Sequence, residues 1–245
     1  MLSEIRKISS LLLSVAFSSI GFIASITVTV LAAREVSSNP LFVGFPNAVG
    51  VGGAVLGTRM IYLISKNNSQ LNALAFTFLI GAFGGAIMFY SLIVDSFVML
   101  LFGAFILGIG QSATLQTRYA ASFVASEKFK ATALSLAVWF SVFGSVFGPR
   151  MVGSYSNFFE NIFNSELIVG YVIALVGMLF AASSLFIFTS KKSILRSPSN
   201  LESESNNQNS NKKNGNLLSL LLVLNHFTMV VICLLYTSPS PRDYP

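Results

Sequence analysis

The chain alternates between long apolar runs and short polar connections. The runs cover residues 9–33, 40–58, 71–94, 96–117, 131–154 and 167–190, with a shorter seventh at 217–235. A helix rises 1.5 Å per residue, so roughly 20 apolar residues cross a hydrocarbon core about 30 Å thick. The pattern therefore predicts an all-α polytopic transmembrane helical bundle of six helices, followed by an incomplete seventh.

Composition supports a membrane-embedded chain. Hydrophobic residues make up 53% of the 245 residues and charged residues only 10%, whereas soluble domains carry about 25% charged residues. An outer-membrane barrel is excluded because its strands would be runs of about ten alternating residues. The formal charge of +6 does not indicate nucleic-acid binding, because the charges lie between apolar runs. The expected surroundings are a lipid bilayer.

The polar segment 191–215, KKSILRSPSNLESESNNQNSNKKNG, interrupts this regular pattern. It is rich in Ser, Asn and Lys and nearly free of apolar residues, which predicts a flexible, solvated linker. The expected organisation is therefore a six-helix transmembrane part at 1–190, a linker at 191–215 and the start of a seventh helix at 216–232.

Basic residues predict the orientation of the helices, because Lys and Arg near helix ends are retained in the cytoplasm. Two basic residues, Arg34 and Arg150, fall on one side of the expected membrane. Twelve fall on the other: Arg6, Lys7, Arg59, Lys66, Arg118, Lys128, Lys130, Lys191, Lys192, Arg196, Lys212 and Lys213. We expect a multi-pass protein of the inner (plasma) membrane with a cytoplasmic N-terminus. The first run is too long for the core of a cleavable signal peptide.

The fifth run carries the most specific motif. It reads ALSLAVWFSVFGSVFGPRMVG and contains Gly144, Gly148 and Pro149 in the order G-x-x-x-G-P, with Gly153 four residues later. This resembles the antiporter signature of exporters of the major facilitator superfamily, although Ser135 and Val152 replace two of its glycines. Glycines one turn apart also form ordinary helix-packing faces, and that alternative stays open.

The layout of six helices, a long basic linker and a seventh helix is also similar to this superfamily, whose transporters join two six-helix halves. The resemblance implies that the chain is the N-terminal half of a secondary active transporter of a small molecule that works by alternating access. The signature favours efflux. An uptake permease of the same fold and a non-transporting membrane sensor or scaffold are the alternatives.

Polar residues in the fourth run, LFGAFILGIGQSATLQTRYAASFVAS, are candidates for substrate binding. Gln111, Thr114 and Arg118 recur at helical spacing, and Gln116 lies among them. Asn47, beside Pro46 in the second run, is a further candidate. Buried amides must be paired or face a cavity, so these residues line a cavity or bond neighbouring helices, and Arg118 could instead be an interface anchor.

Two charged positions that exporters of the superfamily often use are altered here. On the fourth helix, Ala104 stands where an arginine four residues before Gly108 would be expected. Between the second and third runs, Gly57, Arg59 and Lys66 echo a cytoplasmic gate loop but without its aspartate. Arg59 and Lys66 could equally be positive-inside anchors.

The sequence offers no enzyme. A metal site needs clustered His, Cys, Asp or Glu, and the chain has one histidine, His226, and one cysteine, Cys233. We therefore expect no catalytic residue, no metal and no cofactor. No acidic residue lies deep in the first six runs, so coupling to a proton would use the missing half, and the alternatives are a different ion or no coupling.

The C-terminal segment 233–245, CLLYTSPSPRDYP, interrupts the seventh apolar run with prolines and charges. It resembles a translated sequencing-library adapter, and we expect it to be non-native, with the authentic sequence ending near Ile232 in a truncated seventh helix. A natural Pro/Ser-rich tail is the alternative.

Overall fold

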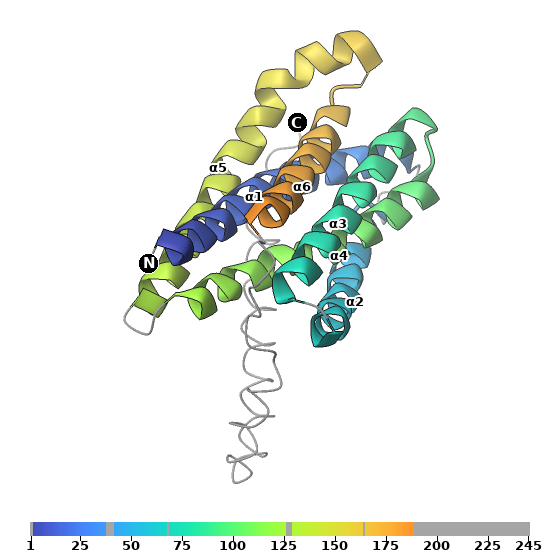
Figure 1. Ribbon diagram of the computed structural model, residues 1–245. Coiled ribbons are helices and arrows are strands. Elements are labelled where there is room, and N and C mark those ends of the chain that lie inside the picture. Colours follow the sequence, from blue (N-terminus) through green and yellow to red (C-terminus); the bar gives the residue numbers. More distant parts are fainter. Residues whose placement is uncertain (1, 38–41, 68, 126–128, 164, 189–245) are drawn as a thin grey trace, which may run out of the picture. The chain divides into compact units, whose positions relative to one another are not determined.

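A computed structural model describes residues 2–37, 42–67, 69–125, 129–163 and 165–188. These residues form six helices and no strand (Figure 1): α1 (Leu2–Val36), α2 (Phe45–Asn67), α3 (Gln70–Ile93), α4 (Phe97–Val124), α5 (Lys130–Phe163) and α6 (Ile168–Phe188). Each helix contains a segment of 20 to 29 residues that is long and apolar enough to cross a membrane. The expected all-α polytopic bundle is confirmed. The expected linker, seventh helix and tail lie outside the described residues.

The end of α2 differs from the sequence prediction. The apolar run was expected to end at residue 58, but the helix continues to Asn67. Arg59 and Lys66 interrupt the hydropathy without interrupting the helix, because both side chains are exposed while Ile61 and Ser65 are buried. The expected loop position is therefore wrong for Arg59 and Lys66, which lie on α2 together with Gly57, while their gate role stays a prediction.

A tight turn joins α3 to α4. The N–H of Val94 donates to the Tyr90 carbonyl at 3.2 Å, and the N–H of Ser96 donates to the Ser91 carbonyl at 3.1 Å. Between them Asp95 adopts a φ of 50°, a left-handed conformation that aspartate tolerates better than most residues. The turn sends α4 back along α3, and these two helices pack extensively on each other.

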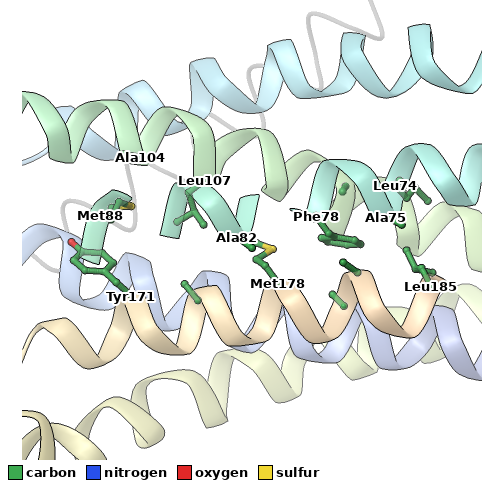
Figure 2. Close-up of a cluster of buried hydrophobic side chains, with 14 of the residues drawn as sticks. Leu74, Ala75, Phe78, Ala82, Met88, Ala104, Leu107, Tyr171, Met178 and Leu185 are labelled. Carbon is green, nitrogen blue, oxygen red and sulfur yellow. The ribbon is translucent and has the colours of Figure 1, made fainter. Parts of the chain in front are cut away.

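The core lies among α1, α3, α4 and α6, and small residues let these helices approach closely. The Cβ position at Gly81 of α3 lies 2.7 Å from the Gly110 Cα of α4, and that at Gly21 of α1 lies 3.0 Å from the Ala174 Cα of α6. Figure 2 shows larger side chains filling the remaining space, with Met178 of α6 reaching toward α3. Any side chain added at these glycines would push two helices apart.

Hydroxyl groups bond α1 to α6 at two separate levels. Near the start of α1, the Ser14 and Ser184 hydroxyls are 2.5 Å apart, and Ser14 also reaches the Ala181 carbonyl at 3.1 Å. Farther along, the fully buried Tyr171 donates to the Thr29 hydroxyl at 3.4 Å. These bonds fix the register of α1 on α6.

Helices α2 and α5 lie on opposite sides of the other four (Figure 1). α2 packs mainly on α4, and α5 mainly on α1. In the most apolar stretch of each helix, only 22% of α2 and 28% of α5 is buried within the bundle, against 44% to 56% for the other helices. The remaining apolar faces of α2 and α5 are therefore open to lipid or to further protein.

Candidate functional site

A cavity of about 200 Å³ opens among α1, α2, α3 and α4. Its walls come from four consecutive helices, so it exists only when these helices are packed together. The lining residues are Phe22, Ser25, Ile26 and Thr29 of α1, Pro46, Asn47, Gly50 and Val51 of α2, Met88 of α3, and Ala104, Leu107, Gly108 and Gln111 of α4.

Glycine contacts between α2 and α4 form one edge of the cavity. A Cβ built on Gly108 would overlap the Gly50 carbonyl oxygen, and one built on Gly53 would overlap the Phe105 carbonyl oxygen. The two backbones therefore touch, which is possible only without side chains at these positions. Ala104, at the position where many exporters of the superfamily have an arginine, is buried and forms part of the cavity wall.

The polar part of the wall is uncharged. Two carboxamides, Asn47 of α2 and Gln111 of α4, line the cavity and are half-buried. Each amide can donate and accept hydrogen bonds. No Asp, Glu, Lys, Arg or His is among the lining residues. The wall can therefore hold a polar solute by hydrogen bonds and enclose its apolar part.

Behind the amides, two hydroxyl groups on α1 are already satisfied. Ser25 donates to the Phe22 carbonyl and Thr29 to the Ser25 carbonyl, each at 2.7 Å. Ser25 and Thr29 are not singled out by the sequence pattern alone. Their signal was a series of small hydroxyl residues on α1 at helical spacing, which also includes the buried Ser18.

The predicted substrate-binding residues divide into two groups. Asn47 and Gln111 come together at the cavity. Thr114, Gln116 and Arg118 do not line it: Thr114 is buried, and Gln116 and Arg118 are half-buried. Gln116 follows Gln111 by five residues, which turns it away from the cavity-lining face of α4.

The fifth-helix signature lies apart from the cavity. Gly144 and Gly148 pack on α1, where their Cβ positions would lie 2.6 Å from the Ser19 Cβ and 3.1 Å from the Ala24 nitrogen. Pro149 lies inside α5 and is exposed. In this arrangement the two glycines form a packing face for α1.

The outer positions of the signature make no such contact. Ser135 is exposed and donates to the Ala131 carbonyl at 2.9 Å. A Cβ built on Gly153 would meet nothing within 4 Å. On α2, by contrast, Gly57 packs against Ile109 and Ser112 of α4, while Arg59 and Lys66 are exposed.

Among the described residues no three His, Cys, Asp or Glu side chains are placed to share a metal ion.

Two curated proteins of Bacillus subtilis (strain 168) are similar to this chain. The MFS-type transporter YdeG is 29% identical over 175 residues, and the MFS-type transporter YddS is 29% identical over 183 residues. The aligned regions cover 71% and 75% of this chain. The resemblance to the major facilitator superfamily is confirmed. The six membrane-length helices agree with half of such a transporter.

The chain spans about two-fifths of the length of these relatives, 41% of YdeG and 42% of YddS. No family model matches the chain, and no solved structure matches it either. Both relatives are named as transporters and neither as an enzyme. The similarity and the six membrane-length helices support a multi-pass membrane protein.

Proposed function

We propose that this chain is the N-terminal half of a secondary active transporter that exports a small molecule across the inner (plasma) membrane. The observation that carries the proposal is the cavity, which has an uncharged polar wall and lies among four membrane-length helices. A site enclosed by membrane-spanning helices can bind a solute away from both aqueous sides. Rocking of two helical halves around such a site gives alternating access.

The packing within the described bundle supports movement as a unit. α1 is bonded to α6 by hydroxyl pairs, and α2 and α4 touch along glycines. Contacts this close resist sliding of one helix past another. We therefore place the moving boundary at the sparsely buried faces of α2 and α5, where a second half would pack.

Export is proposed from the fifth-helix pattern of Gly144, Gly148 and Pro149, which resembles the exporter signature. The coupling ion is proposed to act elsewhere in the transporter. Within the six described spans, the acidic residue is Glu35, near the end of α1, and it is exposed. A proton carrier would thus belong to another part of the protein, or another ion would drive transport.

Flux measurements test this function. The gene read in full would be expressed, and inverted and right-side-out membrane vesicles would be incubated with a mixture of metabolites and cytotoxic compounds. Mass spectrometry would then identify what accumulates. Export predicts energy-dependent uptake into inverted vesicles, whereas uptake into right-side-out vesicles would indicate a permease. A surface-expressed, folded protein that moves nothing in either direction would favour a sensor or scaffold.

The proposed orientation has its own test. In a Cys233→Ser background, Lys66→Cys places a single thiol near the end of α2, just before α3, and Asp95→Cys places one in the turn after α3. Both native side chains are exposed. A cytoplasmic N-terminus predicts that a membrane-impermeant maleimide labels position 95 in intact cells and position 66 only after the cells are opened. The reverse pattern would contradict the orientation.

A further inference from the structure

Among the described side chains of α4, two buried polar atoms have no hydrogen-bond partner: the hydroxyl oxygen of Thr114 and the Nε of Arg118. Thr114 is only 3% exposed. Threonines in helices usually satisfy their hydroxyl on the carbonyl four residues earlier, as Thr117 does with Ala113 at 2.7 Å. A buried hydroxyl and a buried guanidinium nitrogen without partners are each unfavourable, which makes both atoms candidates for ligand binding.

The spacing along α4 connects these groups to the cavity. Gln111, Thr114 and Arg118 follow one another at three and four residues, so they share one face of the helix. Side chains on a helix lean toward its N-terminus, which for α4 is the direction from Arg118 toward Gln111. Seven residues correspond to about 10 Å along the axis. Thr114 and Arg118 therefore follow the cavity-lining Gln111 on the same face of α4.

The chemistry of the pair selects an acceptor. A guanidinium can only donate hydrogen bonds, and its planar arrangement of N–H groups matches a carboxylate. The Thr114 hydroxyl can add a further donor. Inside a membrane an ionised side chain is expensive without an opposite charge. An anionic oxygen ligand would satisfy both unpaired atoms at once.

We propose that Thr114 and Arg118 form a carboxylate subsite next to the substrate cavity, on the same face of α4 as the cavity-lining Gln111. The inference rests on the proposed transport function and names the substrate class: a small solute with a carboxylate at one end. Its carboxylate binds Arg118 and Thr114, and its uncharged part lies among Asn47, Gln111 and the apolar cavity wall. Arg118 is then a binding residue instead of an interface anchor.

Binding of a matched series of probes tests the subsite. Butyrate, butyramide and butylamine have similar size and differ in charge at pH 7. Each would be titrated against the purified 245-residue chain in deuterated detergent, with binding followed by saturation-transfer NMR. We expect butyrate to bind about tenfold more tightly than butyramide, the effect of one charge-assisted hydrogen-bond pair, and butylamine to bind most weakly.

Matched variants locate the effect. Arg118→Gln should reduce butyrate binding to the level of butyramide, and Arg118→Lys should retain part of the difference. The control Arg150→Gln, at an exposed position on α5, should leave the series unchanged. Thr114→Val should weaken butyrate binding about threefold to tenfold. Its control Thr117→Val removes a buried hydroxyl on the same helix whose bond is already satisfied.

The outcomes separate this inference from the proposed function. Equal binding of butyrate and butyramide, or a preference that survives Arg118→Gln, overturns the carboxylate subsite even if the full protein transports another solute. Conversely, Arg118-dependent butyrate binding without flux in vesicles would support the subsite and contradict transport. Equal effects of Thr114→Val and Thr117→Val would assign Thr114 to folding and overturn its part in the subsite.

Discussion

At the scale of single residues, glycines set the distances between helices. Gly108 illustrates this, because its missing side chain lets the α2 and α4 backbones touch beside the cavity. The same residue type at Gly153 faces open space. In the sequence both are glycines on apolar helices. Only the atoms that surround them in the folded protein show that Gly108 is needed for helix packing and Gly153 is not.

This difference predicts opposite effects of one substitution. Gly108→Ala should destabilise the protein by about 1–3 kcal/mol, as overpacking does, because its methyl group would overlap the Gly50 carbonyl oxygen. Gly153→Ala should be neutral or stabilising by up to about 1 kcal/mol from helix propensity. Thermal unfolding in detergent, followed by circular dichroism, checks both. Equal losses of stability would contradict the close approach of α2 and α4.

Asp95 is a second residue whose role depends on backbone conformation. At a φ of 50° glycine is unstrained, so Asp95→Gly should maintain or raise stability by about 0.5–1 kcal/mol, and Asp95→Val should lower it by about 1–2 kcal/mol. The same unfolding measurement applies. A valine variant as stable as the glycine variant would show that this turn is not left-handed.

At the scale of elements, α5 exposes much of its apolar surface. Trp139, the single tryptophan of the chain, lies on α5 and is 67% exposed. In a bilayer we expect it to face lipid acyl chains. After reconstitution of the 245-residue chain, its fluorescence should be strongly quenched by lipids with brominated acyl chains and weakly by aqueous iodide. Strong quenching by iodide alone would place α5 outside the hydrocarbon region.

The number and type of the described helices could be predicted from the sequence. A segment that crosses a bilayer must pair its backbone polar groups within a helix, and its side chains then appear in the sequence as one long apolar run. The end of α2 could not, since Arg59 ends the apolar run while the helix continues with its charges exposed. Helix ends are the least certain part of any such prediction, and here Arg59 and Lys66 lie on a helix instead of in the predicted loop.

The candidate site was partly predictable. Asn47 and Gln111 could be found as amides in apolar runs, where an unpaired amide is unfavourable. Ser25, Thr29 and Met88 could not, because they are common residue types on apolar helices and only the packing of α1 and α3 against α4 brings them to the cavity. The unpaired atoms of Thr114 and Arg118 likewise depend on tertiary packing.

At the scale of the whole molecule, we propose that the described bundle is half of a two-part transporter. We expect the 245-residue chain alone to catalyse no flux, because the second wall of the solute pathway would be absent. Proteoliposomes containing only this chain should therefore release a trapped metabolite mixture no faster than empty ones. Saturable, solute-selective release by this chain alone would contradict the half-transporter account.

Resequencing the source DNA across the codons for Val231 to Tyr236 tests the expected tail. We predict that the reading frame continues into about five further apolar segments, the number that completes two six-helix halves. A frame that runs without change to Pro245 would contradict the truncation and make assembly of the described bundle with a second copy the next question.

The central claim is that the cavity among α1, α2, α3 and α4 carries the transported solute. The most direct test compares flux of the full transporter with that of Gln111→Ala, which removes a cavity amide, and of Gln70→Ala, which removes an amide at the start of α3 outside the cavity. We predict that Gln111→Ala lowers flux at limiting solute by about tenfold, as loss of a buried hydrogen bond does, while Gln70→Ala retains it. Equal flux in both variants, at equal expression and stability, would contradict the claim.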